Sequence, residues 1–168
     1  IWHVSGTGAT DNLLQGNTVS SSTLNGIRVN AAPRTQILSN TIGLNPAGTT
    51  GIDNWSSGIS LSDDTDTTIQ GNTISGNRGH GIYMTGTQQI TITGNIIGLN
   101  AAGGLAIPNR STAGIYMRAN VVTATIRGNT VSGNRYNGIF LGSGTTGVVI
   151  AGNYIGTDIN GTTGVGNG

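Results

Sequence analysis

The sequence predicts an all-β solenoid, a single domain over residues 1–168 in which the chain winds into about six coils of three short strands. A motif of apolar residue, polar residue, Gly or Ser, Asn, any residue and apolar residue recurs along the whole chain. Its asparagines are Asn17, Asn40, Asn72, Asn95, Asn129 and Asn153. A second motif, Gly-Ile-any residue-large apolar residue, alternates with the first. No segment shows the 3.6-residue apolar period of an amphipathic helix.

The amino-acid composition argues against several classes of function. The chain has 30 Gly, 8% charged residues, a net charge of +1 and no Cys. These values offer no electrostatic case for nucleic acid, no disulfide framework and no Cys-ligated metal. No apolar run approaches the roughly 18 residues of a membrane span, so we expect no membrane insertion. The chain opens at Ile1 without Met or a signal peptide, so we expect a segment or a processed product.

Period-two alternation assigns the inward side chains of each strand. In the first strand of each coil they are Ile27, Val29, Ile59, Leu61, Ile82, Met84, Ile115, Met117, Ile139 and Leu141. In the second strand they are Leu14, Ile37, Ile69, Ile92, Ile126 and Ile150. In the third strand they are Val19, Ile42, Ile74, Ile97, Val131 and Ile155. Stacking like on like predicts a thin apolar core.

The asparagine column falls at a sharp turn between the second and third strands. Stacked amides can hydrogen-bond along the axis as a ladder. We therefore predict a structural ladder made of Asn17, Asn40, Asn72, Asn95, Asn129 and Asn153.

These repeats resemble right-handed parallel β-helix proteins of the pectate-lyase-like group. More narrowly, NIIGLNAAG at 95–103 and NYIGTDINGT at 153–162 resemble the repeats of large bacterial surface or secreted β-helix proteins. The resemblance covers the whole chain. It implies a right-handed, single-stranded β-helix at an extracellular or cell-surface location in bacteria, and it leaves activity open because this scaffold hosts many functions.

Coil lengths alternate. Asn17 to Asn40 spans 23 residues and Asn40 to Asn72 spans 32, and the alternation continues along the chain. After the third strand, short coils carry Ser20, Ser75 and Ser132, whereas long coils carry Gly43, Gly98 and Gly156 and then a loop. The unit is therefore a pair of coils, and the chain holds three pairs.

The two ends of the chain are in phase with one another. If Ile1 followed Gly168, the junction would restore a rough Gly-Ile motif, and Asn153 to the next Asn17 would span 32 residues. We therefore expect either one period of a longer array or copies that stack head to tail into a filament. Exposed strand edges favour such self-association.

Three sets of residues are candidates for sites. Asp63, Asp64 and Asp66 form a weak candidate for a Ca²⁺ site, and we favour a solvated turn because Ca²⁺ takes six to eight oxygens. Three sequons begin at Asn54, Asn109 and Asn160, in long-coil loops where a glycan acceptor would be exposed, although coincidence is the better reading in so Asn-rich a chain. The third set faces outward from the first strand.

That outward column reads His3, Arg28, Ser60, Tyr83, Tyr116 and Phe140, with Tyr136 and His80 nearby. The aromatic rings offer a surface for sugar rings or a partner chain. The alternative is a side cluster covered by the long-coil loops, and we favour that alternative.

The sequence shows no facing pair of carboxylates, no Glu and no Ser-His-Asp pattern, so we expect no catalytic residues, no cofactor and no metal. We interpret the chain as a non-catalytic structural or adhesive extracellular β-helix that associates end to end or extends a long surface protein. The alternative is a polysaccharide-binding or lyase-like polysaccharide-processing module that uses the Tyr83, Tyr116 and Phe140 face.

Overall fold

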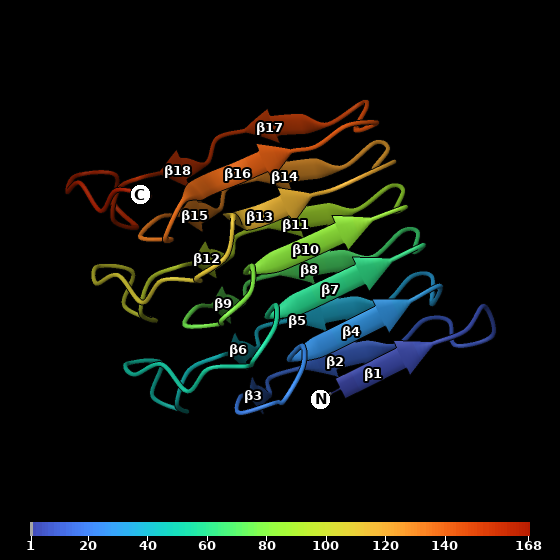
Figure 1. The fold of residues 1–168 in the computed structure, drawn as a ribbon, viewed down its shortest axis with the longest axis horizontal. Helices are drawn as coiled ribbons and strands as arrows, with labels where there is room; N and C mark the ends of the chain where they lie inside the picture. Colours follow the sequence, from blue (N-terminus) through green and yellow to red (C-terminus); the bar gives the residue numbers. More distant parts are fainter. Residues whose placement is uncertain (1) are drawn as a thin grey trace.

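The computed structural model describes residues 2–168 and confirms the parallel solenoid. Its strands form three parallel sheets of six strands each, and each coil contributes one strand to every sheet. Figure 1 shows the coils stacked from β1 at one end to β17 and β18 at the other. Ile1, and with it the predicted junction from Gly168 to Ile1, lies outside the described residues.

Sheet A is built from the first strand of each coil. Its strands are β1 (Trp2–Ser5), β4 (Ile27–Asn30), β7 (Ile59–Ser62), β10 (Ile82–Thr85), β13 (Ala113–Met117) and β16 (Asn137–Leu141). Sheet B contains β2 (Leu13–Gln15), β5 (Gln36–Leu38), β8 (Thr68–Gln70), β11 (Thr91–Thr93), β14 (Thr125–Arg127) and β17 (Val149–Ala151). Sheet C contains β3 (Thr18–Val19), β6 (Thr41–Ile42), β9 (Thr73–Ile74), β12 (Ile96–Ile97), β15 (Thr130–Val131) and β18 (Tyr154–Ile155).

The apolar core lies between the three sheets. The parallel register pairs like with like, for example Ile69 with Ile92 and Ile92 with Ile126. All three side chains are fully buried, as predicted. Burying an Ile side chain stabilises the fold by about 1.5–3 kcal/mol, so each coil adds several kcal/mol of core. The inward columns become exposed at the two ends of the described stack, at Trp2 in the first coil and at Leu141, Ile150 and Ile155 in the last.

The Ser and Gly that distinguish short from long coils contact one another directly. Ser75 Oγ donates to Leu99 O at 2.7 Å and accepts from Gly98 N–H at 3.0 Å. Gly98 has a φ of 97°, and a Cβ there would lie 2.1 Å from Ser132 O. Only glycine therefore fits where a long coil leaves sheet C between two short coils.

The long coils project three loops, 43–52, 98–107 and 156–165, which we call the flange. Each loop is closed by an antiparallel bridge: Leu44 with Gly51, Leu99 with Ala106 and Thr157 with Gly164. The loops contact each other past the short coils, since Ala101 N–H donates to Gly48 O at 2.9 Å and Ile159 N–H donates to Gly103 O at 3.0 Å. Figure 1 shows the flange as loops on one side of the stack.

The predicted asparagine column is confirmed and lies at the corner between sheets B and C; we call it the first ladder. Asn72 N–H and Nδ2 both donate to Asn95 Oδ1 at 2.9 Å. Asn72 Nδ2 also donates to Ile37 O in the coil below at 2.8 Å. Since its interior members are buried, these bonds replace water for the asparagine amides inside the turn.

A second ladder, which the sequence analysis missed, lies at the corner between sheets C and A. Its members are Asn54, Asn77, Asn109, Asn134 and Asn167. Asn77 Nδ2 donates to Asn109 Oδ1 at 2.9 Å, and Asn109 Nδ2 donates to Asn134 Oδ1 at 3.0 Å.

This second ladder corrects the sequon prediction. Asn54 and Asn109 are fully buried, so the expectation that they would be exposed acceptors is wrong. Their side-chain amides are hydrogen-bonded inside the folded chain. Asn160, in the flange, is exposed and stays a prediction.

The third corner, between sheets A and B, has no matching ladder in residues 2–168. Asp64 is buried there, where its Oδ1 accepts from Ala32 N–H at 3.0 Å and its Oδ2 accepts from Thr67 Oγ1 at 2.5 Å. Burial raises the pKa of the Asp64 carboxyl despite these hydrogen bonds. The expected solvated turn is wrong for Asp64, which is buried. Within residues 2–168, no three His, Cys, Asp or Glu side chains gather into a group that could hold a metal ion, so Asp63 and Asp66 do not complete a site with Asp64.

Within residues 2–168, no helix is long and apolar enough to cross a membrane.

Candidate binding face

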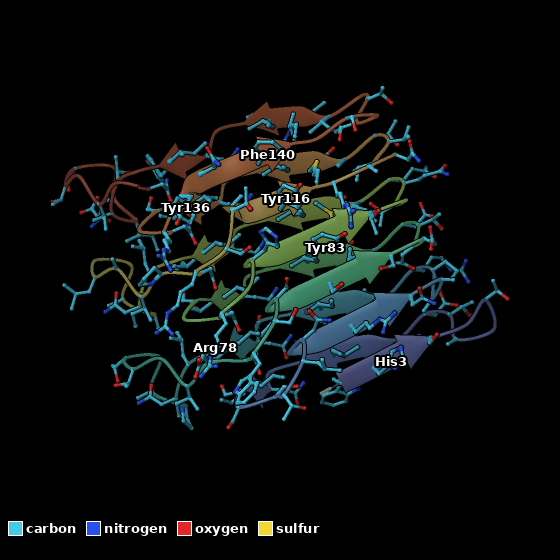
Figure 2. The ribbon with its side chains drawn as sticks, in the orientation of Figure 1. His3, Arg78, Tyr83, Tyr116, Tyr136 and Phe140 are labelled. Carbon is cyan, nitrogen blue, oxygen red and sulfur yellow. The ribbon has the colours of Figure 1, made fainter. Side chains whose placement is uncertain are left out.

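The outward side of sheet A carries the predicted column. The register pairs His3 with Arg28, Arg28 with Ser60 and Ser60 with Tyr83, and it continues through Tyr116 to Phe140. Because parallel coils repeat every ~4.8 Å, these side chains follow one line along the axis. Figure 2 shows Tyr83, Tyr116 and Phe140 on successive strands, with His3 at the far end of the column.

Four rings stack into what we call the aromatic strip: His80, Tyr83, Tyr116 and Phe140. His80 lies nearly parallel to Tyr116, with centroids 4.6 Å apart and planes 7° apart. Tyr116 and Phe140 stack at 5.2 Å, and Tyr83 and Tyr116 at 5.9 Å. The strip is half-buried, and Phe140 is 38% exposed. The structure thus brings His80, Tyr83, Tyr116 and Phe140 together as predicted.

Tyr136 lies apart from these stacked pairs. It occupies the turn before β16, is 48% exposed and packs against the Arg135 guanidinium at 5.4 Å from the ring centroid. Figure 2 places it beside the strip, toward the flange side.

A pocket of about 350 Å³ opens at the lower end of the strip. It is lined by Asn25, Ser56, Ser57, Ser60, Gly79, His80, Tyr83 and Ser111. In the described part of the chain this wall offers hydroxyls, an amide and an imidazole, but no carboxylate. Such convergent polar groups beside a ring are typical of a small-molecule or sugar site.

His80 is held in the pocket wall by polar contacts on both ring nitrogens. Its Nδ1 lies 3.3 Å from both Ala113 N and Ala113 O, and its Nε2 lies 3.4 Å from Ser111 Oγ. Burial lowers the pKa of His80, while the contact with Ala113 opposes that shift. The ring is therefore neutral at pH 7 and can both donate and accept a hydrogen bond.

Arginines flank the strip along the corner of the second ladder. Arg78, Arg110 and Arg135 each follow a ladder asparagine, and Arg110 N–H bonds Asn77 O just as Arg135 N–H bonds Asn109 O. They form a second axial line, which we call the arginine line. Arg118 lies across the strip, where its Nη1 donates to Tyr83 Oη at 3.4 Å.

One carboxylate faces this line. Asp53 Oδ2 accepts from Arg78 Nε and lies 3.8 Å from Arg110 Nη1. The hydrogen bond from Arg78 is the main cause that lowers the pKa of Asp53. Arg78 also packs over the Trp55 ring at 4.7 Å. Arg78 and Arg110 remain about half exposed, at 49% and 53% of their side-chain surface.

The predicted line of aromatic residues is therefore correct in position, whereas the arginine line was missed. The signal was present, because an Arg follows three of the second-ladder asparagines, but that ladder itself had not been identified. The arrangement offers ring faces, hydroxyls and guanidinium groups on one surface. It suits binding of an extended polar ligand.

Comparisons with known proteins agree with the fold. The model of the right handed beta helix region matches residues 4–155. No curated protein matches the chain. Among solved structures, a double mutant of the periplasmic alginate epimerase AlgG has a TM-score of 0.68 at 17% identity, covering 86% of this chain and 34% of that chain.

The A-module of the mannuronan C-5 epimerase AlgE6 of Azotobacter vinelandii has a TM-score of 0.52 at 15% identity, covering 84% of this chain and 52% of that chain. The chain thus spans only about a third to a half of the solved proteins it matches. At these identities the likeness shows the fold alone. Because the family model covers nearly the whole described solenoid, the chain belongs to the right-handed β-helix family.

Proposed function

We propose that this chain is a non-catalytic, structural and adhesive segment of an extracellular β-helix protein. Its adhesive surface is the aromatic strip, and its ligand is an acidic polysaccharide. The observation that carries this proposal is the stack of His80, Tyr83, Tyr116 and Phe140 along the axis, between the arginine line and Arg118.

Ring faces favour sugars because the apolar C–H face of a pyranose packs on an aromatic surface. Tyr adds a hydroxyl that can hydrogen-bond at the edge of the sugar. The strip repeats with the coil, so successive sugars of one extended chain can contact successive rings. We expect the hydroxyl groups of one sugar to enter the pocket beneath the strip, where Ser60, Ser111 and Asn25 can hydrogen-bond to them.

Charge favours an acidic chain over a neutral one. Arg118 contacts Tyr83 of the strip, and the arginine line follows the corner of the second ladder on the other side of the strip. Asp53 is the carboxylate that pairs with this line. A guanidinium can bind a carboxylate through two parallel hydrogen bonds. The named structural neighbours are polysaccharide epimerases, which supports the ligand class.

The alternative is polysaccharide processing, and His80 beside Ser111 is the observation that favours it. Lyase or hydrolase chemistry needs a positioned acid and base, and the pocket wall supplies an imidazole without a carboxylate. We expect no change in polysaccharide length, unsaturation or sugar composition after incubation with the protein. Turnover detected by ultraviolet absorbance of unsaturated ends or by NMR would favour the alternative.

The test is a binding measurement against alginate and polygalacturonate, with dextran as a neutral probe. We expect Tyr116→Ala to weaken binding about tenfold or more, a loss of roughly 1.4 kcal/mol. Tyr154→Ala, an exposed tyrosine on sheet C, is the matched control and should bind as the parent does.

Arg118→Gln should weaken binding to the acidic probes most strongly at low salt, because salt screens exposed charges. Equal binding of dextran and alginate would contradict the claim that the arginines favour an acidic polysaccharide. Unchanged binding by a Tyr83→Ala/Tyr116→Ala variant would remove the proposal.

A further inference from the structure

The charge of the arginine line is not uniform along the axis. Arg78 and Arg110, in two successive coils, share the carboxylate of Asp53. Arg135, in the coil above them, pairs with no carboxylate in the described part of the chain and lies over the Tyr136 ring instead. Figure 2 shows Arg78 and Tyr136 at different heights on the same side of the stack. The lower part of the line is therefore partly neutralised, whereas the upper part keeps its charge.

The residues that precede the second-ladder asparagines explain this difference. Arg78 and Arg135 each donate a backbone N–H to the carbonyl oxygen of the ladder asparagine in the long coil below. The residue just before that asparagine is Asp53 in one long coil and Pro108 in the next. The place from which Asp53 reaches Arg78 is therefore taken by an uncharged proline beneath Arg135.

Asp53 is held beside both guanidinium groups. It accepts a hydrogen bond from Arg78 Nε and lies 3.8 Å from Arg110 Nη1. The Arg78 guanidinium also packs over the Trp55 ring, 4.7 Å from its centroid, so a second contact fixes its position. The hydrogen bond from Arg78 lowers the pKa of Asp53, which keeps the carboxyl ionised at neutral pH. The side chain of Asp53 is 29% exposed, so it stays within reach of a bound ligand.

A ligand carboxylate is disfavoured at the lower part of the line. To bind Arg78 or Arg110, it must approach a guanidinium that already contacts the carboxylate of Asp53, and two carboxylates so close repel each other. An uncharged sugar meets no such repulsion, and its hydroxyl groups can still accept hydrogen bonds from both arginines. Arg135 has no carboxylate beneath it, so a ligand carboxylate is accepted there.

We propose that Asp53 is a specificity-determining residue that closes the lower part of the arginine line to ligand carboxylates, so that uncharged or esterified sugars lie beside Asp53 and a sugar with a free carboxylate lies beside Arg135. This inference rests on the proposed polysaccharide binding and adds the pattern of charge along the ligand. Coils repeat every ~4.8 Å, comparable to the length of one sugar, so the sugars of one axial chain meet successive arginines. Asp53 thereby lets a mixed chain of charged and uncharged sugars compete with a fully ionised one.

The test compares two polysaccharides with the same backbone, polygalacturonate and partly methyl-esterified polygalacturonate. Calorimetric titration of the 168-residue chain gives the ratio of the two affinities, fully charged over esterified. Asp53→Asn opens Arg78 and Arg110 to carboxylates, so we expect this ratio to rise about two- to fivefold, the range for one exposed charge interaction. Binding of polygalacturonate by the variant should also weaken more steeply with added salt, because more charge pairs form.

Asp11→Asn is the matched control. Asp11 also forms an exposed ion pair, with Arg34 at 2.6 Å, so the two substitutions change the net charge equally. Asp11 lies between β1 and β2, at the corner between sheets A and B and away from the arginine line. We expect this control to keep the affinity ratio of the parent.

Pro108→Asp tests the same rule in the opposite direction. It places a carboxylate beneath Arg135, as Asp53 stands beneath Arg78. We expect polygalacturonate binding to weaken about two- to fivefold and the affinity ratio to fall. Asp53→Asn alters an exposed side chain, so it decides the question if Pro108→Asp loses the circular dichroism of the parent.

Two results would overturn the inference. An unchanged affinity ratio in Asp53→Asn would mean that Asp53 does not select for ligand charge, and weaker polygalacturonate binding by that variant would mean that Asp53 holds Arg78 in place for the ligand. If Tyr116→Ala weakens binding while Asp53→Asn keeps the parent's ratio, this inference fails alone. A parent that binds neither polysaccharide would remove the proposed function and this inference together.

Discussion

The two asparagine ladders stack buried amides at two corners of the same coils, but they differ in how fully each amide is used. Asn95, in the first ladder, makes six hydrogen bonds through its side chain and N–H. Asn109, in the second ladder of the same coil, makes four through its side chain. The path between sheets B and C has one length in every coil, whereas the path between sheets C and A carries the flange in alternate coils.

Where the backbone path has one length, Asn72, Asn95 and Asn129 repeat the same set of bonds. Where the path alternates, the rungs stay aligned but their bonds vary. For example, Asn77 N–H donates to Asn109 Oδ1 at 3.2 Å, longer than the 2.9 Å of Asn72 N–H to Asn95 Oδ1.

Replacing an interior rung of the first ladder should have the largest effect. Asn95→Ala leaves Asn72 N–H buried without its acceptor, removes one acceptor of Asn72 Nδ2 and removes the amide donor to the buried Ile69 O. Unsatisfied buried donors cost about 1–3 kcal/mol each, so we expect the free energy of unfolding to fall by roughly 3–5 kcal/mol. Urea denaturation followed by circular dichroism measures it. A loss below that of Asn109→Ala would contradict the ranking of the ladders.

The matched change in the second ladder should cost less. Asn109→Ala removes bonds to Ile74 O and Asn134 Oδ1 and the acceptor for Asn77. We expect a loss of about 2–3 kcal/mol in the same denaturation experiment. If Asn95→Ala and Asn109→Ala cost the same, the number of bonds per rung does not set the stability of a ladder.

The third corner tests what an isolated buried polar group does without a ladder. Asp64→Asn should stabilise the fold at neutral pH, since the buried carboxyl has a raised pKa and its oxygen toward Ala32 N–H is retained as an amide oxygen. In the parent, the Asp64 carboxyl ionises at a lower pH in the unfolded chain than in the folded chain. Stability therefore falls from the ordinary Asp pKa up to the raised folded pKa.

Chemical denaturation across acidic to neutral pH checks this prediction. The Asp64→Asn curve should lose that decline. The Asp11→Asn curve should keep that decline. The hydrogen bond from Arg34 lowers the pKa of Asp11 to about 2, so the contribution of Asp11 to stability changes with pH in the opposite direction. A parent whose stability does not fall over that window would contradict the role of Asp64.

The smallest effect is expected at Thr87, in the same corner. Its Oγ1 is buried and has no hydrogen-bond partner among residues 2–168. Thr87→Val removes that hydroxyl at nearly constant shape, so we expect a change within about 0.5 kcal/mol or a small gain. A loss as large as that of Asn109→Ala, measured by thermal unfolding, would mean that the hydroxyl is bonded.

Much of this fold follows from the sequence because the strand corners repeat. The inward columns and the first ladder were predictable because the Gly of each Gly-Ile motif precedes the next ladder asparagine by 14 or 15 residues. The second ladder was hidden by the alternation: Asn40 to Asn54 and Asn95 to Asn109 span 14 residues, whereas Asn72 to Asn77 spans 5. A search for one constant period misses it, and the sequons at Asn54 and Asn109 then resemble loop sites.

The candidate site was predictable in part for the same reason. Tyr83, Tyr116 and Phe140 share a strand position, so alternation places them in one outward line. His80 joins their stack from the preceding turn, and Arg118 approaches from the following one. Those approaches depend on turn geometry, which residue periodicity does not determine.

The stacked flange also bears on how the chain finds its own pairing while folding. Near-identical coils invite a strand to pair with the wrong neighbour, an error that displaces every later coil. A slip of one coil would set a long coil directly against a long coil, or a short coil against a short one, and would break contacts such as that of Ser75 Oγ with Gly98 N–H. A slip of two coils restores every such contact. The alternation therefore disfavours slips by an odd number of coils, and the misfolded forms that survive should leave whole pairs of coils out of the stack.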